Sequence, residues 1–130
     1  MTRQTNPILL IGNDLLILGL AAILRARGRR VLVRGDGHHD LDKLLAGPRP
    51  AAILIDLMII WHDDFALLRQ IRTLSHFRAV PVLVLSPGTV GPDHARLDSR
   101  LRALGAQPFL SPHDLDDVLN ELERSLVSVA

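Results

Sequence analysis

The sequence predicts a three-layer α/β fold: a doubly wound, five-stranded parallel sheet with helices on both faces. Short, continuously apolar runs recur along the 130 residues, and segments with helical apolar spacing lie between them. Apolar character that is continuous rather than alternating indicates strands covered on both faces, as in a parallel sheet. Strands that alternate with helices indicate βα units with right-handed crossovers, which place helices on both sides of the sheet.

The predicted strands are the apolar runs PILLI, RVLV, AAILI, VPVLVL and QPFL, at residues 7–11, 30–33, 51–55, 80–85 and 107–110. In parallel α/β sheets, binding sites form outside the carboxyl ends of the strands. The candidate functional residues are therefore the polar, glycine and proline residues that follow each run. They are Gly12, Asn13, Asp14, Asp56, Ser86, Pro87, Ser111 and Pro112.

The predicted helices cover residues 14–27, 41–47, 63–74, 93–104 and a last segment from Asp114 onward. Each has apolar residues about one helical turn apart. Asn13 or Asp14 is expected to be the N-cap of the first helix, and Gly28 to end it. Asp63 and Asp64 are expected to cap the third helix, because carboxylates in the first turn complement the helix dipole.

Composition indicates one compact domain covering residues 1–130. Hydrophobic residues make up 48% and charged residues 22%, which excludes the disordered and fibrous classes. No apolar run approaches the roughly 20 residues needed to span a bilayer, so a cytoplasmic protein without membrane contact is expected. The absence of cysteine excludes disulfides and thiolate chemistry, and a net charge of +1 without clustered basic residues argues against direct nucleic-acid binding.

In order along the chain, these segments resemble the receiver domain of response regulators in two-component signalling, which has a flavodoxin-like fold. ILLIGNDLLILGLAAILRARG resembles the first strand and helix of that family, and ILIDLMIIWHDDFALLRQIR resembles the third. VPVLVLS resembles the fourth strand, and LGAQPFLSPHDLDDVL the fifth strand and last helix. The resemblance covers nearly the whole chain, and thirty residues separate Asp56 from Ser86, as the family pattern leads one to expect.

The resemblance implies an assisted phosphoryl transfer. In the family, an acidic pair after the first strand holds Mg²⁺, and an aspartate after the third strand accepts the phosphoryl group. A hydroxyl after the fourth strand senses that group, an aromatic residue of the fifth strand belongs to the switch, and a lysine after the fifth strand stabilises the phosphoryl oxygens. By position, Asp56 matches the phosphoacceptor, Ser86 the sensing hydroxyl and Phe109 the switch aromatic.

The metal site of that machinery is reduced. Where the family has its acidic pair, this chain has Gly12 and Asn13, with Asp14 one position further on. A glycine offers no ligand, and an amide carbonyl offers Mg²⁺ only a dipole where a full charge is expected. Asn13, Asp14 and Asp56 are what remains of a metal site, so Mg²⁺ is expected only if phosphoacceptor function survives, and no other cofactor is expected.

The lysine is lost altogether. The only lysine of the chain is Lys43, and Ser111 precedes Pro112 where the family pattern places its lysine. A neutral serine cannot supply the charge-assisted hydrogen bond that a lysine makes to a phosphoryl oxygen. Without cationic partners, partial burial should raise the pKa of Asp56 relative to that in an ordinary receiver, with ionisation at neutral pH as the default expectation.

The segment MIIWH at residues 58–62 differs from the corresponding family loop, which tends to hold a proline and glycines beside the phosphorylation pocket. Ile59, Ile60 and Trp61 stand there instead. Contiguous apolar residues on a surface mark a contact site or a pocket lid. The alternative is that these residues fold inward and fill the metal site.

The sequence therefore predicts a non-enzymatic, receiver-like signalling module in which phosphorylation is impaired and which acts through protein contact. Its expected partner is a histidine kinase or a downstream effector, and the last two helices with the fifth strand resemble the surface through which receivers form homodimers. One alternative is a conventional Mg²⁺-dependent receiver that uses Asp56. The other is a nucleotide- or flavin-binding protein of the same architecture, although the turn GND lacks the glycine-rich cradle that phosphate groups need.

Overall fold

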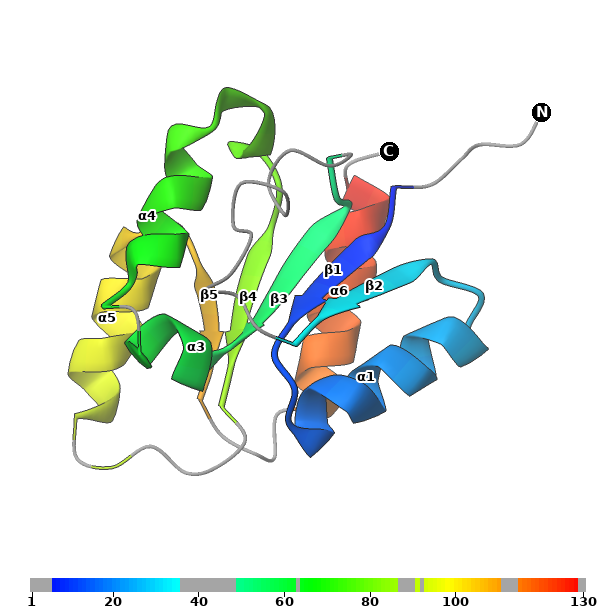
Figure 1. Ribbon diagram of the computed structural model, residues 1–130, viewed down its shortest axis with the longest axis horizontal. Helices are drawn as coiled ribbons and strands as arrows, with labels where there is room; N and C mark the ends of the chain where they lie inside the picture. The colour runs from blue at the N-terminus through cyan, green and yellow to red at the C-terminus, as the bar shows by residue number, and fades with distance from the viewer. Residues whose placement is uncertain are drawn as a thin grey trace.

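The computed structural model describes residues 6–35, 49–62, 64–86, 91, 93–110 and 115–128. Its sheet consists of β1 (Ile8–Ile11), β2 (Val31–Arg34), β3 (Ala52–Asp56), β4 (Val82–Leu85) and β5 (Gln107–Phe109). The strand order is β2-β1-β3-β4-β5, and all the pairings are parallel (Figure 1). Every predicted strand is present, with ends that differ by at most two residues, so the predicted α/β class is confirmed.

Helices cover both faces of this sheet (Figure 1). On one face lie α1 (Leu15–Ala26) and α6 (Leu115–Ser128), and on the other lie α3 (Leu57–His62), α4 (Ala66–Thr73) and α5 (His94–Ala103). The predicted first, third, fourth and last helices are confirmed, and the predicted helix at residues 41–47 lies outside the described residues. In the part of the chain that the structure describes, no helix combines the length and apolar character needed to cross a membrane.

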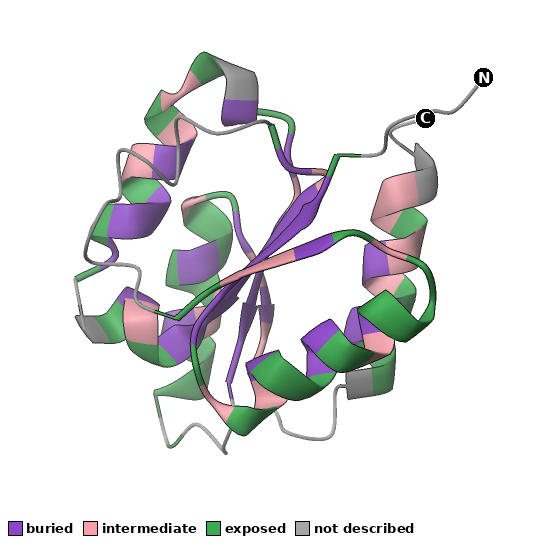
Figure 2. Ribbon diagram, turned by 45° about the vertical axis from the view of Figure 1, so that its right-hand side comes forward, coloured by how far each residue is buried: buried purple, intermediate pink, exposed green. Residues whose placement is uncertain are grey.

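Two apolar cores, one on each face of the sheet, hold the three layers together. Alternate residues of a strand point to opposite faces. Leu9 and Ile11 of β1 therefore join the core under α3, α4 and α5, whereas Ile8 and Leu10 join the core under α1 and α6. Strands β1, β3 and β4 are buried along their whole length (Figure 2), which is why their sequences are continuously apolar.

Asp14 begins α1. Its backbone is extended, and its Oδ1 accepts a hydrogen bond of 2.9 Å from the Ile17 N–H, which is the geometry of an N-cap. The helix ends at Ala26, and Gly28 follows with a left-handed φ of 83°. Of the two caps that the sequence offered, Asp14 rather than Asn13 is the one used.

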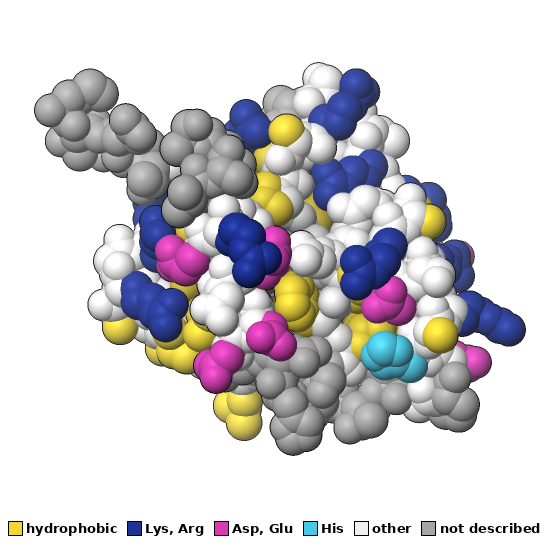
Figure 3. Space-filling model, turned by 180° about the vertical axis from the view of Figure 1, so that it is seen from behind, with side chains coloured by type: hydrophobic (Ala, Val, Ile, Leu, Met, Phe, Trp, Pro, Cys, Tyr) yellow, Lys and Arg dark blue, Asp and Glu magenta, His cyan; other side chains and the backbone are white. Residues whose placement is uncertain are grey.

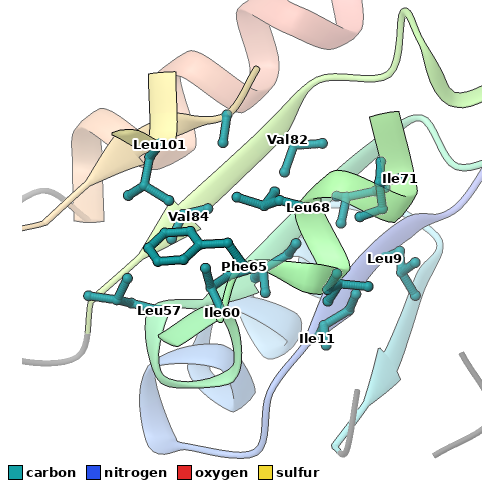
Figure 4. Close-up of a cluster of buried hydrophobic side chains, with 14 of the residues drawn as sticks. Leu9, Ile11, Leu57, Ile60, Phe65, Leu68, Ile71, Val82, Val84 and Leu101 are labelled. Atoms are coloured by element: carbon teal, nitrogen blue, oxygen red, sulfur yellow. The ribbon is translucent and has the colours of Figure 1, made fainter. Parts of the chain in front are cut away.

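The helix α3 follows β3 without a loop. It begins at Leu57, directly after Asp56, where the family resemblance suggested a loop. Leu57 and Ile60 are buried and pack with Phe65 and Leu68 in the core shown in Figure 4. The last residue of β3 therefore also fixes the start of a helix.

On the face that carries α6, side chains of both charges are interspersed (Figure 3). Arg29 forms an ion pair with Glu123 of α6, and Arg124 pairs with Glu121 within the same helix. The first pair links the residues before β2 to the last helix. These two carboxylates of α6 are therefore already occupied by cations of the same chain.

The turn between α3 and α4 is left-handed. Asp64 and Phe65 have φ angles of 55° and 66°, and the Phe65 N–H donates to the Ile60 carbonyl over 2.9 Å. Phe65 is the N-cap of α4, and no side-chain hydrogen bond caps that helix. The prediction that Asp64 caps it was wrong, because Asp64 lies within the turn with an exposed side chain 3.8 Å from Arg100. Asp63 lies outside the described residues.

Replacing Asp64 by glycine should stabilise the fold. Glycine adopts a positive φ without the steric cost of an L side chain, although it also gives the unfolded chain more freedom. We expect the free energy of unfolding, measured by urea denaturation, to rise by about 0.5 kcal/mol. Asp93→Gly is the matched control, because Asp93 is exposed and makes no capping hydrogen bond, but has a φ of −86°. Equal changes in the two variants would contradict a strained turn at Asp64.

Candidate functional site

Two carboxyl groups, those of Asp14 and Asp56, meet at the carboxyl ends of β1 and β3. Asp56 is the last residue of β3 and is 5% exposed, and its Oδ1 accepts a hydrogen bond of 2.9 Å from the Met58 N–H in α3. The side chain of Asp14 lies close enough to that of Asp56 to raise its pKa. Ionised carboxylates are acceptors alone, so a close contact between two carboxyl groups is favourable only when one of them is protonated.

Burial raises the pKa of Asp56, and the neighbouring Asp14 adds to the effect. Loss of hydration is the largest cause, the hydrogen bond and negative charge of Asp14 act in the same direction, and the Met58 N–H lowers the pKa. The result is a pKa of about 7 in place of 3.8, a rise in the expected direction but larger than expected from the sequence, which favoured an ionised Asp56 at neutral pH. Near neutral pH the pair therefore still holds a proton in a large share of the molecules.

When both carboxyl groups are ionised, one oxygen of the pair has no donor. Oδ1 of Asp14 is occupied by the Ile17 N–H, whereas its Oδ2 is buried without a hydrogen-bond partner. Among the described residues, no arginine forms an ion pair with Asp14 or Asp56. Because a buried charge without a partner is costly, the pair needs either a proton or an external cation. The residues Lys43, Pro87, Ser111 and Pro112 lie outside the described part of the chain.

The two carboxylates are suited to Mg²⁺. This ion takes hard oxygen ligands and is usually held in proteins by one or two carboxylates, with waters and phosphate oxygens completing the shell. Asp14, with its unpaired Oδ2, and Asp56 would hold it. Asn13, the third residue predicted for a residual metal site, is exposed, and its Cβ lies 3.6 Å from where a Cβ on Gly35 would stand, at the end of β2. No cluster of three acidic, histidine or cysteine ligands exists among the described residues.

Gly12 provides the space in which the pair fits. Its φ is +147°, and a Cβ built there would lie 2.9 Å from the Asp56 Cβ and 3.0 Å from the Ile17 Cγ1. Carbon atoms that are not bonded prefer about 3.5 to 4.0 Å, so any side chain at this position would force its neighbours apart. The family resemblance places an acidic residue here, and this backbone has no room for one. From the sequence, Gly12 counted only as a lost ligand, although a glycine at a strand end is also a signal of close approach.

Ser86 and Phe109 lie on the other side of β3 from β1. The strand register pairs Asp56 with Leu85, and Leu85 with Phe109, so that Ser86 comes one residue beyond the level of Asp56. Ser86 is buried, and its N–H donates to the Phe109 carbonyl over 3.1 Å. Phe109 is half-buried against the core under α1 and α6. The roles of sensing hydroxyl and switch aromatic remain predictions.

The predicted contact segment divides between core and surface. Because residues 57–62 form a helix, positions three apart share a face. Ile60 is fully buried with Leu57, so its assignment to a contact surface or lid was wrong. Ile59 is partly buried against the same core. Trp61 is 50% exposed and Met58 is 59% exposed. Met58 was not among the residues predicted to form the contact surface.

Comparison with solved structures identifies the fold as that of receiver domains. The receiver domain of a sensor histidine kinase from Pseudomonas aeruginosa, which has a magnesium ion in its active-site cleft, matches with a TM-score of 0.70 and 24% identity over 94% of this chain and 98% of that one. The signal receiver domain of a histidine kinase from Syntrophus aciditrophicus gives a TM-score of 0.75 and 22% identity, over 96% of this chain and 92% of that one.

A response regulator shows the same likeness. The chemotaxis response regulator CheY4 of Vibrio cholerae gives a TM-score of 0.69 and 21% identity over 92% of this chain and 99% of that one. The chain therefore has the receiver fold that the resemblance predicted. No family model and no curated protein matches the sequence.

Substitution of Gly12 should destabilise the protein. Gly12→Ala places a Cβ against Asp56 and Ile17, and we expect a loss of about 2 kcal/mol in the free energy of unfolding. Gly12→Asp should cost at least as much and should not increase the affinity for Mg²⁺, measured by calorimetry. Gly19→Ala is the control, because a Cβ at Gly19 in α1 meets nothing within 4 Å. A stable Gly12→Asp variant that binds Mg²⁺ more tightly would show that this position does accept a ligand.

Asp56 should also make stability fall as pH rises. The folded protein keeps a proton that the unfolded chain releases between its pKa of 3.8 and the folded value of about 7, so raising the pH through this window favours unfolding. The loss over the whole window is at most about 4 kcal/mol, of which at most about 3 kcal/mol falls between about pH 5 and about pH 8, where urea denaturation measures it. Asp56→Asn imitates the protonated group and should lack this loss, whereas Asp116→Asn, on the exposed side of α6, should retain it. Identical pH profiles for wild type and Asp56→Asn would exclude Asp56 as the titrating group.

Proposed function

We propose that this chain is a receiver-like signalling module that acts through protein contact and in which phosphorylation of Asp56 is impaired. The observation that carries the proposal is the carboxyl pair, in which Asp14 lies beside a buried Asp56 and no described cation pairs with either, so that burial and Asp14 raise the pKa of Asp56 to about 7. A phosphoacceptor attacks as an ionised carboxylate, because a protonated one is a much weaker nucleophile. A pair that keeps its proton near neutral pH is therefore poorly suited to the reaction.

The positive charge that the transfer needs is also scarce. The oxygens of a transferring phosphoryl group carry dispersed negative charge, which cations must neutralise in a fixed arrangement. Lys43 is the only lysine of the chain, and residues 104–122, which include β5 and the segment after it, contain no arginine. Two carboxylates without a cation repel an incoming phosphate. This charge balance supports a role for Asp56 in the structure of the site rather than in chemistry.

The proposed partner is another signalling protein, either a histidine kinase or a downstream effector, and the proposed place of action is the cytoplasm. Two of the solved structures that the chain resembles are receiver domains of histidine kinases. A homodimer through α5, β5 and α6 is a further proposal, which rests on the resemblance alone. No enzymatic activity of the chain itself is proposed.

The second candidate is a conventional Mg²⁺-dependent receiver that uses Asp56. One observation favours it, because the unpaired Oδ2 of Asp14 beside Asp56 offers Mg²⁺ two carboxylate ligands. When bound, the ion would supply part of the missing positive charge. The rival nucleotide- or flavin-binding function has no such observation among the described residues in its favour.

Incubation with acetyl phosphate and Mg²⁺, followed by intact-mass measurement, separates the two candidates. We expect no phosphoryl adduct under conditions in which a conventional receiver domain, treated in parallel, is modified. Asp56→Asn is the control for the site of any adduct. A Mg²⁺-dependent adduct that forms on the wild type and is lost in Asp56→Asn would establish the conventional receiver and overturn the proposal.

A further inference from the structure

The sheet ends at β2 on one side and at β5 on the other (Figure 1). Within the described part of the chain, each of these strands pairs with one neighbour only. An edge strand presents backbone N–H and C=O groups to whatever lies beside it, so an unprotected edge is a place where another chain can add a strand. The groups that occupy these edges therefore determine whether this sheet can grow.

In β2, the carbonyl groups of Val31 and Val33 point away from β1. The carbonyl groups of Arg30 and Arg34 accept hydrogen bonds of 2.9 and 2.8 Å from N–H groups of β1 and of the residue after it. Residues of a strand in a parallel pair direct their backbone groups alternately toward the partner and away from it. The carbonyl groups between and before these two positions therefore face the outer side of the sheet.

Two arginine side chains occupy these outward carbonyl groups. Nη2 of Arg25, in the last turn of α1, donates to the Val31 carbonyl over 3.1 Å, and Nη1 of Arg34 donates to the Val33 carbonyl over 3.2 Å. We call Arg25 and Arg34 the edge arginines. A carbonyl group that already accepts from a charged side chain is a poor partner for a new strand, and charged residues are a common protection of sheet edges.

The edge arginines share this contact although their places in the fold differ. A basic residue in the last turn of a helix complements the helix dipole, which accounts for a cation at Arg25 but not for its bond to β2. Arg34 belongs to no helix, and its side chain bonds to the residue directly before it. What the two side chains have in common is the row of outward carbonyl groups that they cover.

At the opposite edge, β5 lacks the donors that a new strand would need. The Phe109 carbonyl accepts from the Ser86 N–H over 3.1 Å, so Phe109 faces β4 and Pro108, next to it, faces outward. Proline has no N–H to offer and is tolerated in strands at such edges. The N–H of Ala106, two residues before Pro108, is occupied by the Leu101 carbonyl of α5 over 2.9 Å. This edge is therefore closed by its backbone alone.

We propose that the edge arginines are an autoinhibitory contact, which prevents a second copy of this chain from pairing its own β2 with the edge of this sheet. Two identical edges related by a twofold axis run antiparallel and match each other, so a second copy is the natural occupant of an uncovered β2. In the native chain, the approach of two such edges also brings arginines of like charge together. The inference goes beyond the proposed function, since it does not depend on Asp14 or Asp56, and it leaves the helices as the surfaces for protein contact.

Removal of both edge arginines tests this proposal. In the full chain carrying Arg25→Ala and Arg34→Ala together, amide hydrogen exchange at Val31 and Val33 is measured by NMR at low and high protein concentration. Pairing at the β2 edge would bury these outward N–H groups, so we expect exchange to slow at least about tenfold at the high concentration. In the wild type, the exchange rates should be independent of concentration. Sedimentation should show a dimer of the double variant.

A matched double variant, Arg27→Ala with Arg30→Ala, removes the same charge from two exposed arginines that make no side-chain hydrogen bond or ion pair with a described residue. It should show no dependence on concentration. Arg34→Ala alone covers the case in which loss of Arg25 disrupts the contact between α1 and β2, because the Arg34 side chain bonds only to the preceding residue, and it should slow exchange at Val33.

Three outcomes would overturn the proposal. One is exchange that does not depend on concentration in the double variant and in Arg34→Ala. Another is equal slowing in the variant that lacks Arg27 and Arg30, which would assign the effect to net charge rather than to the covered carbonyl groups. The third is slowing at Val31 and Val33 in the wild type itself, since the edge would then be open with both arginines in place.

Discussion

The close approach of two carboxyl groups at the ends of β1 and β3 governs this site. Neither group is free to turn away, because each also holds a neighbouring helix. Asp14 caps α1 through the Ile17 N–H, and Asp56 accepts from the Met58 N–H at the start of α3. The repulsion between them is therefore relieved by a change in charge rather than by movement, and burial together with Asp14 raises the pKa of Asp56 to about 7.

This arrangement connects the electrostatics of the site to its surface. The residue after Asp56 already belongs to α3, so no flexible loop lies between the buried carboxyl group and the side chains of Met58 and Trp61. No loop separates Asp14 from α1 either, because Leu15 follows it directly as the first residue of that helix. Any ligand that changes the charge on the pair acts on groups that are rigidly joined to the exposed apolar residues around it.

The sequence was sufficient for the architecture because the central strands are buried on both faces and carry unbroken apolar runs. The position of Asp56 followed from the same logic, since residues after a parallel strand meet at one edge. Less could be predicted where tertiary contacts determine whether a segment is helical and which of its side chains are buried. Asp56 is a residue type that caps helices and accepts the Met58 N–H at the start of α3, but it was interpreted only as the end of a strand, so the buried and exposed faces of residues 57–62 were missed.

The carboxyl pair itself was only half predicted. A missing acidic residue at Gly12 suggested a depleted site, but pairwise proximity of Asp14 and Asp56 depends on the backbone path after β1, which one sequence does not define. The same limit applies to the turn before α4. Aspartate is a residue type that often caps helices, yet the path of the chain from Ile60 to Phe65 places Asp64 in a left-handed turn instead.

The tight fit around Gly12 also limits how this site could be redesigned. An aspartate here would stand where even a methyl group meets Asp56 and Ile17. The backbone path after β1 would have to change before that side chain could be accommodated, so an acidic pair at residues 12 and 13 requires remodelling of the turn as well as new side chains. Sterics thus decide which residue types this turn accepts.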